Sequence, residues 1–254
     1  MNPEILSQLY KTLSWSPQAI QQEQFTQLYS EILRGNRQFN LTRITDEEAF
    51  WEKHIWDSLS GLSPWLSREN PSEISGEVFG KMSQLQPQRG IDIGTGGGFP
   101  GIVAAIVLPQ TQITLLDSTR KKITFLQEVI QTLKLNTVKM IVDRVETLGH
   151  DRQHRSQYDL ALIRAVGTPA VCAEYALPLL KLGGTAVLYR GQWTGEEEKH
   201  LSQVAQQLGG ELKAVQAWTT PLTGGIRHCV YLNKVGPTPN AYPRAIGVPS
   251  QTPL

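Results

Sequence analysis

Residues 91–101 read IDIGTGGGFPG, and this stretch limits the possible folds more than any other part of the chain. Five of its eleven residues are glycine, and an apolar run follows it. Glycine permits positive φ angles and lets the backbone approach a ligand closely. A helix that begins there presents free N–H groups. We therefore expect a ligand loop between a strand and a helix, for a phosphate, a nucleotide or a small sulfonium cofactor.

From residue 89 to 234 the chain repeats a pattern of apolar strand, turn and helix. Strands are predicted at 89–93, 112–117, 138–142, 158–166, 185–191, 211–218 and 228–234. Helices are predicted after the glycine stretch and at 118–135, 168–184 and 196–208. Such alternation favours a mainly parallel, doubly wound sheet with helices on both faces. The predicted fold class is therefore α/β and Rossmann-like.

Three segments lie outside this 89–234 domain. Residues 1–66 are predicted to form an N-terminal helical cap, since apolar residues recur on one helix face and Thr45 or Asp46 can cap a further helix. Residues 67–88 are polar and are interpreted as a connector or insertion. Residues 235–254 contain five prolines, so we predict an extended arm without regular helix or central strand.

Composition excludes several classes of protein. The N-terminus has an early acid and no apolar core, so we expect no signal peptide, and the apolar run 102–108 is too short to span a bilayer. Two cysteines 57 positions apart suggest neither a metal site nor a disulfide framework, and a reducing cytoplasm is the expected setting. The net charge of +1 requires any nucleic-acid surface to be local.

The glycines fit two motifs. Gly96, Gly98 and Gly101 match GxGxxG, but with Gly94 as the first glycine the third position is Phe99, which breaks the dinucleotide fingerprint. An apolar–acid–apolar–GxGxG pattern fits better and resembles the first motif of Rossmann-like methyltransferases that use S-adenosylmethionine. Asp92 would then order the loop and face the cationic amino-acid part of that cofactor. The alternative is a glycine turn without a ligand.

The second strand ends in Asp117, followed by Ser118 and Thr119. A carboxylate there can accept hydrogen bonds from both ribose hydroxyls of a nucleoside. Enzymes that use NAD share this feature, and Asp117 can also serve as the N-cap of the next helix. No P-loop is present, because no glycine run is followed by GKS or GKT.

The acceptor of a methyl group is narrowed by elimination. The segment after the fourth strand reads IRAVGTP, without the Asn- or Asp-Pro-Pro-aromatic stretch that usually accompanies methylation of exocyclic amines. Carbon-5 methylation of pyrimidines needs a nucleophilic cysteine, whereas Cys172 and Cys229 lie in apolar segments typical of a core. A ring nitrogen with a free lone pair needs neither a base nor a nucleophile and is compatible with the sequence.

A set of motifs in one order gives a more specific resemblance, which covers about 3–66 and 89–254. The chain resembles the bacterial GidB/RsmG family of small-subunit ribosomal RNA guanine-N7 methyltransferases. The resemblance implies methyl transfer from S-adenosylmethionine to N7 of a guanine in the 530 loop of 16S ribosomal RNA, in the small ribosomal subunit. The motifs are Asn40-Leu41-Thr42, His54-Ile55-Trp56-Asp57-Ser58, DIGTGGGFPG, LLDSTRKKITFL, Arg144-Val145-Glu146, IRAV, YRGQ and YPR.

The family's cofactor residues carry over by motif position. The resemblance implies that Gly94 and Phe99 contact the cofactor and that residues 117–119 lie along its ribose and adenine. It also implies that Val145 and Glu146 flank the adenine. Arg164 would then lie at the opening where cofactor and substrate meet. Phe99 and Val145 can instead simply pack, and Glu146 can pair with Arg144. Placing an arginine at the end of a buried strand costs free energy unless its charge meets a phosphate, a carboxylate or a base. This cost favours a role for Arg164 in binding.

This chain departs from the family pattern at three places. Arg190 follows the fifth strand where the family commonly has lysine, Ile163 precedes Arg164 where it often has serine, and Ile226-Arg227-His228 replaces Glu-Arg-His. Arginine keeps the charge of lysine but not its geometry. These changes bear on contacts with the acceptor, for which Arg190, Arg227 and His228 are candidates.

Charge is unevenly distributed along the chain. Residues 118–144 contain six basic and two acidic side chains, whereas residues 1–60 contain five basic and eight acidic ones. The first turn of a predicted helix contains Arg120, Lys121 and Lys122. Cations at this end oppose the helix dipole, so their presence there is explained if they bind an external phosphate. A solvated helix face is the alternative.

Other residues are weaker candidates for RNA contacts. Tyr242 and Arg244 can stack on a base and meet a phosphate, unless the tail is loose, and Asn40 and Arg43 can shape the acceptor pocket. His54 and Asp57 are expected to form a hydrogen-bonded structural pair, since N7 carries no proton to remove.

Three rival functions remain open. They are a methyltransferase for a small molecule or protein, a non-catalytic RNA- or ribosome-binding protein that uses the cofactor structurally, and a dinucleotide oxidoreductase.

Overall fold

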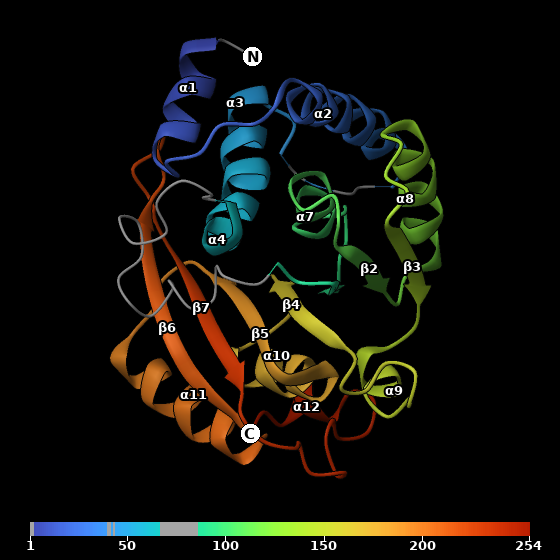
Figure 1. Cartoon of the computed structure of the whole chain (residues 1–254), viewed down its shortest axis with the longest axis vertical. Helices are drawn as coiled ribbons and strands as arrows, with labels where there is room; N and C mark the ends of the chain where they lie inside the picture. Colours follow the sequence, from blue (N-terminus) through green and yellow to red (C-terminus); the bar gives the residue numbers. More distant parts are fainter. Residues whose placement is uncertain (1–2, 40–41, 43, 67–85) are drawn as a thin grey trace.

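The computed structural model describes residues 3–39, 42, 44–66 and 86–254 (Figure 1). Its centre is a seven-stranded sheet in the order β3-β2-β1-β4-β5-β7-β6. The first five strands in this order are parallel, and β7 runs antiparallel between β5 and β6. The strands are β1 Arg89–Ile93, β2 Gln112–Asp117, β3 Val138–Val142, β4 Tyr158–Arg164, β5 Leu180–Arg190, β6 Gly210–Thr219 and β7 Ile226–Lys234. The predicted α/β, mainly parallel fold is confirmed.

The strands contribute side chains to two hydrophobic clusters, one on either face of the sheet, although β1 supplies only Ile91 and Ile93, both to the same cluster. Along β4, for example, Leu160 and Leu162 belong to one cluster, whereas Ala161 and Ile163 belong to the other. This alternation follows from the two-residue period of a strand, and burial on both faces explains the nearly continuous apolar run in β4.

One face is covered by two layers of helices (Figure 1). Next to the sheet lie α7 Gly101–Val107, α8 Arg120–Thr132 and α4 Asp57–Leu66. Outside them, α2 Ala19–Phe39 packs on α7 and α8, and α1 Pro3–Lys11 packs on the helical segment that leads into α4. The helices predicted for the N-terminal cap therefore complete the core on this face.

The opposite face carries α10 Pro169–Ala176 and α11 Gly195–Gln207, with the short helices α9 Val145–Leu148 and α12 Val248–Gln251 beside them (Figure 1). The loops that follow β1, β2 and β4 come together at the carboxyl edge of the sheet. A hydrogen bond from Gly96 N to Asp117 Oδ2 links the first two loops, and Val166 of the third lies so close to Gly94 that a Cβ there would meet it. This is where open parallel sheets bind ligands.

The last part of the N-terminal cap has an unusual helical geometry. Asp46 Oδ1 accepts a 2.8 Å hydrogen bond from Ala49 N, which confirms the predicted N-cap of α3 Glu47–Phe50. The chain continues as a π-helix, η1 Trp51–Trp56, before α4. In α4 a Cβ on Gly61 would lie 2.4 Å from the Tyr189 ring, so this glycine permits close contact between α4 and β5.

Two predictions about secondary structure were wrong. The helix predicted at 168–184 ends at Ala176, and a 3-10 turn over Leu177–Leu179 leads directly into β5. The pairing of β4 with β5 is irregular between Tyr158 and Leu160, so residues 181–184 form a bulge there. The proline-rich arm also contains a regular turn, α12, because its Pro249 lies in the first turn, where no N–H is needed.

Residues 67–85 of the predicted connector lie outside the described residues, so the division of the chain at 66 and 88 stays a prediction. Within the part of the chain that is described, none of the helices is long and apolar enough to cross a membrane.

Candidate functional site

The glycine loop after β1 is held to the neighbouring strand by its backbone. Gly94 N and Thr95 N both donate to Leu116 O, at 2.8 and 2.9 Å. Gly94 and Gly96 have φ angles of +70° and +57°, which other residues rarely adopt. A Cβ on Gly94 would meet Val166 Cγ2 at 2.7 Å, whereas a Cβ on Gly96 would have only Gly94 O nearby, at 3.8 Å. Space therefore remains open above Gly96.

Asp92 lies beneath this loop and is fully buried. Its Oδ2 accepts hydrogen bonds from Thr95 Oγ1 at 2.6 Å and from Gly101 N at 2.8 Å, so the carboxylate orders the loop as predicted. Among the described residues, Asp92 Oδ1 has no hydrogen-bond partner. Burial raises the pKa of Asp92 to about 6. A cationic ligand group near Oδ1 would offset this cost of burial.

Asp117 joins the glycine loop to the turn after β2. Its Oδ2 accepts a 3.0 Å bond from Gly96 N, and its Oδ1 accepts a 2.8 Å bond from Thr119 N. Thr119, not Asp117, occupies the N-cap position of α8, so the alternative of Asp117 as N-cap was wrong. Ser118 and Thr119 are exposed beside it. Contact of these three residues with a ribose stays a prediction.

Val145 and Glu146 begin α9 and are both buried. Glu146 Oε1 accepts bonds from Arg144 Nη2 at 3.0 Å, Tyr175 Oη at 3.0 Å and Gly247 N at 3.1 Å. Burial alone would raise the pKa of Glu146, but these bonds outweigh it and lower the pKa below its usual value. The carboxylate therefore points into the protein and binds the C-terminal arm, and Val145 packs in the core. Their contact with an adenine stays a prediction.

Arg164, the last residue of β4, has partners within the protein. Its Nη1 donates to Lys53 O at 2.8 Å and to Asp57 Oδ2 at 2.9 Å, and its Nη2 lies 3.2 Å from His54 Nδ1. The sequence suggested that Arg164 meets an external anion, but Asp57 of the protein itself supplies the carboxylate. Arg164 still lies beside the glycine loop, with its Cζ 5.8 Å from the centre of the Phe99 ring.

The ring of His54 is neutral and has partners at both nitrogens. Because a guanidinium has only donors, Nδ1 must accept from Arg164, so Nε2 carries the proton and donates to Thr42 Oγ1 at 2.8 Å. Burial, with the charges of Arg164 and Lys53, lowers the pKa of His54 to about 3. His54 and Asp57 were expected to pair directly, but both instead contact Arg164.

Phe99 follows the glycine run and packs against the cap. Its ring is stacked on that of His54, with centroids 4.5 Å apart and planes 11° apart, and it meets Phe50 edge-on at 5.7 Å. Phe99 is buried, as the packing alternative proposed. These ring contacts lie within the protein, and contact of Phe99 with a cofactor stays a prediction.

Arg190, Arg227 and His228 lie near one another at the ends of β5 and β7. Arg190 pairs with His228 in the sheet register, and its Nη1 donates to Gly167 O at 2.7 Å. His228 Nδ1 lies 2.7 Å from Gly191 O. Arg227 Nε lies 3.7 Å from Asp57 Oδ1, so Asp57 stands between Arg164 and Arg227. The structure thus brings these three candidates to the same side as Arg164.

The basic residues at the start of α8 differ in whether they have a partner within the protein. Arg120 and Lys121 are exposed in the first turn of α8, whose N-cap makes no side-chain hydrogen bond. Lys122 Nζ lies 3.9 Å from Asp117 Oδ2. Asn40 and Arg43 lie outside the described residues, so their role stays a prediction.

The C-terminal arm uses its candidate residues internally. Arg244 Nη2 and Nε donate to Glu174 Oε2 and Oε1 at 2.7 and 3.0 Å, and Glu174 is fully buried. Tyr242 packs against the second hydrophobic cluster, and its carbonyl oxygen accepts from Arg155 at 2.7 Å. The arm is therefore docked and not loose, and Arg244 already has the anion that an RNA phosphate was expected to supply.

Sequence reasoning missed two residues whose hydrogen bonds shape this region and gave a third the wrong partner. Thr95 was not singled out, yet its hydroxyl donates a hydrogen bond to Asp92. Glu52 was not singled out, although it is buried and accepts three hydrogen bonds. Asp57 was expected to pair with His54. The π-helical register that aims Glu52 and Asp57 has no clear signature in the sequence.

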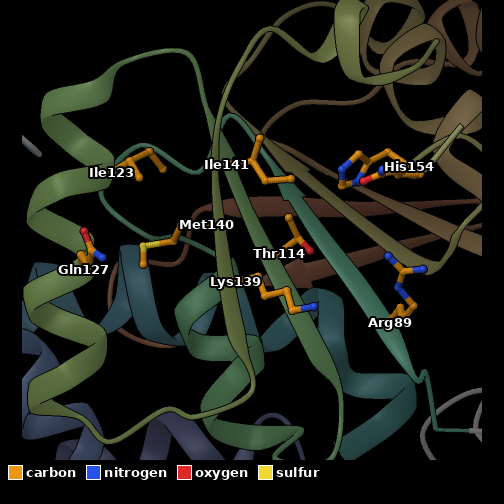
Figure 2. Close-up of a pocket in the computed structure, with 9 residues that line it drawn as sticks. Arg89, Thr114, Ile123, Gln127, Lys139, Met140, Ile141 and His154 are labelled. Carbon is orange, nitrogen blue, oxygen red and sulfur yellow. The ribbon is translucent and has the colours of Figure 1, made fainter. Parts of the chain in front are cut away.

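A separate depression lies at the sheet edge formed by β3 (Figure 2). It has a volume of about 540 Å³ and is lined in part by Arg89, Thr114, Lys139 and His154. Arg89 is the first residue of β1, whereas the glycine loop follows the last residue of that strand. The depression runs along β3, and none of its lining residues belongs to the glycine loop.

Comparison with known proteins gives consistent matches. A model of the family described as rRNA small subunit methyltransferase G, GidB, matches residues 21–229. The chain is 52% identical to the ribosomal RNA small subunit methyltransferase G of Nostoc sp. strain PCC 7120, over 99% of this chain and 98% of the relative. It is 53% identical to the protein of the same name from Nostoc punctiforme, with the same coverage.

Solved structures with lower similarity share the fold. TYW2 of M. jannaschii, in complex with AdoMet, has a TM-score of 0.51 and 16% identity, and the match covers 77% of this chain and 79% of that one. The 16S rRNA (adenine(1408)-N(1))-methyltransferase from Catenulisporales acidiphilia has a TM-score of 0.50 and 14% identity, covering 60% of this chain and 87% of that one. These likenesses show a class I methyltransferase fold.

Proposed function

The chain belongs to the rRNA small subunit methyltransferase G family, GidB, and from that premise we propose that it methylates N7 of a guanine in the 530 loop of 16S ribosomal RNA. S-adenosylmethionine is its cofactor and supplies, when bound, an electrophilic methyl group on a sulfonium. The observation that carries this proposal is the glycine loop, with an orphaned buried carboxylate oxygen beneath it and open space above Gly96.

The residues of the loop fit the cofactor by their chemistry. Asp92 Oδ1 is an unpaired acceptor for a cationic group. Asp117 has its two oxygens bonded to Gly96 N and Thr119 N, and each oxygen has a second lone pair for a ribose hydroxyl. Gly96 has no Cβ to project into the space that the cofactor would fill, and its positive φ angle favours glycine at this position.

The site's own groups favour an acceptor that needs no proton removed. N7 of guanine has an in-plane lone pair and no proton, so the protein's task is to orient it behind the methyl group. His54 is neutral, and both its nitrogens are already bonded, to Arg164 and Thr42. Burial raises the pKa of Cys172 to about 11 and that of Cys229 to about 12, which does not favour a thiolate nucleophile.

Positive groups near this edge suit a phosphate backbone. These groups are Arg120 and Lys121, exposed in the first turn of α8, and Arg190 and Arg227 at the ends of β5 and β7, where His228 pairs with Arg190 in the sheet register. Arg164, held by Asp57, supplies a positive group beside the loop without itself needing an RNA phosphate. The proposed partner is the small ribosomal subunit, and we expect the protein in the cytoplasm, where that subunit is available.

A comparison of acceptors tests the proposal. The purified full chain and labelled S-adenosylmethionine are given one acceptor in each of three reactions. The acceptors are small subunits from cells lacking the endogenous enzyme, the deproteinised RNA of those subunits, and large subunits. Label in the RNA of the small subunit supports the proposal. Label in protein would instead favour the rival protein methyltransferase, and cofactor binding with no label in any acceptor would favour a non-catalytic binding protein.

A further inference from the structure

Glu52 is a buried carboxylate on the π-helix η1, only 1% exposed. Its Oε1 accepts hydrogen bonds from Leu222 N at 2.6 Å and Thr223 N at 3.0 Å, and its Oε2 accepts from Thr223 Oγ1 at 2.6 Å. All three donors are neutral and belong to the loop between β6 and β7. Burying a carboxylate is costly unless its oxygens are well bonded, so this arrangement strongly prefers one position of the loop.

The loop that Glu52 holds is itself compact. Thr220 N donates to Gly225 O at 2.7 Å, and Gly225 N donates back to Thr220 Oγ1 at 2.7 Å. Thr220 Oγ1 also lies 2.9 Å from Thr223 Oγ1. Because these bonds join the two ends of the loop, the hold of Glu52 on residues 222 and 223 extends to the start of β7.

The first residues of β7 are the ones that face the site. Arg227 lies two residues after the loop and approaches Asp57, and His228 follows it and bonds to Gly191 O. Asp57 N donates to Glu52 O, which is the i to i−5 bond of the π-helix. One helical turn therefore aims Glu52 at the tip of the loop and Asp57 at Arg227 and Arg164.

We propose that Glu52 is a positioning residue for the RNA substrate: through the loop at 220–225 it places Arg227 and His228 beside Arg164 for contact with the phosphate backbone near the target base. This inference rests on the proposed function. Glu52 touches neither the glycine loop nor its carboxylates, so its effect falls on the RNA and not on the cofactor.

The test compares Glu52→Ala with wild type in methyl transfer to small subunits and in cofactor affinity by calorimetry. Loss of Glu52 frees the loop, and a misplacement far from the chemistry can cost up to about 100-fold. We expect the KM for subunits to rise on the order of tenfold, with the Kd for S-adenosylmethionine within about twofold of wild type. Glu52→Gln keeps an oxygen for the two backbone N–H groups, so it should restore most of the activity.

Asp159→Ala is the matched control. Asp159 Oδ2 also accepts from two backbone N–H groups, Gln88 N at 3.0 Å and Arg89 N at 2.8 Å, but Asp159 is near the other end of β4 from Arg164. It should lower the melting temperature without changing the KM for subunits. Thr223→Ala removes one bond to Glu52 and keeps the other two, so a smaller rise in KM is expected from it even if Glu52→Ala fails to fold.

Two results would overturn the inference. One is a KM for subunits that is unchanged in Glu52→Ala. If Glu52→Ala does not fold, an unchanged KM in Thr223→Ala has the same meaning. The other is an equal loss in Asp159→Ala, which would make the effect one of general stability. Wild-type protein that transfers no methyl group to the subunit would instead be a failure of the proposed function, and it is visible before any variant is measured.

Discussion

Arg164 Nη1 donates a 2.9 Å hydrogen bond to Asp57 Oδ2, which joins the end of a central strand to the helical segment that covers the sheet. The two side chains are 17% and 12% exposed, so the ion pair is largely but not fully buried. It lies beside the glycine loop on one side and near Arg227 on the other. The cap and the site are therefore one structural unit.

Removing one partner of this pair should destabilise the fold. Asp57→Ala leaves the Arg164 guanidinium without its carboxylate, and we expect the free energy of unfolding to fall by about 1–3 kcal/mol, given partial exposure to solvent. Urea denaturation measures it. In a double-mutant cycle, Arg164→Ala with Asp57→Ala should cost less than the two single changes together. Strict additivity would mean that the pair contributes nothing.

Cofactor affinity should depend on pH through Asp92. Burial raises the pKa of Asp92 in the free protein to about 6, so the carboxylate is protonated below that pH. A cationic ligand favours the ionised form, and its binding must then displace a proton. The Kd for S-adenosylmethionine should therefore rise as pH falls through 6, by up to about tenfold per pH unit. Calorimetry between pH 5 and about 8 measures it, and Asp92→Asn should bind weakly without this dependence.

A methyl group on Gly96 should obstruct the cofactor. The backbone there has φ +57°, and a Cβ would project into open space, so Gly96→Ala costs about 1–2 kcal/mol of backbone energy and also fills the cradle. We expect the Kd for S-adenosylmethionine to rise about tenfold or more, a loss of about 1.4 kcal/mol.

Gly183→Ala is the control for this prediction. Gly183 has φ +80° with nothing within 4 Å of a Cβ, so the backbone cost is similar while the site is untouched. An unchanged Kd in both variants would remove the glycine loop as the cofactor site. Gly94→Val is less informative, because its side chain would also collide with Val166.

Arg244 should matter for stability and not for RNA. Glu174 is 0% exposed, and Arg244→Ala leaves its carboxylate without a counter-charge, so we expect a loss of about 3 kcal/mol in thermal or urea unfolding. The KM for small subunits should stay near wild type in the folded fraction. A large rise in KM with little change in stability would restore the phosphate contact that the sequence suggested.

The sequence predicted the framework of the fold because strands and helices here have clear periodicity. The bounds of β1, β2 and β3 match the prediction, and Asp92 orders the glycine loop as its motif position implied. The helix at 168–184 was overextended, because Gly183 and Gly184 resemble a helix end when they in fact lie in a bulge of β5.

The partners of charged residues could not be predicted in the same way. Arg164 meets Asp57 across 107 positions of the chain, and Arg244 meets Glu174 across 70. Such pairs depend on how helices and strands cross in space, which local patterns do not encode. For this reason Arg164 and Arg244 both looked available to an RNA ligand, when each has an anion within the protein.

The proposed reaction is best checked by locating the methyl group in the RNA. Small subunits from cells without the endogenous enzyme are treated with the wild-type chain and S-adenosylmethionine, and the RNA is then cleaved chemically at N7-methylated guanine. We expect one new cleavage, in the 530 loop, that at limiting S-adenosylmethionine is weaker with Gly96→Ala and unchanged with Gly183→Ala. Methyl transfer without cleavage, or cleavage elsewhere in the RNA, would contradict the proposal.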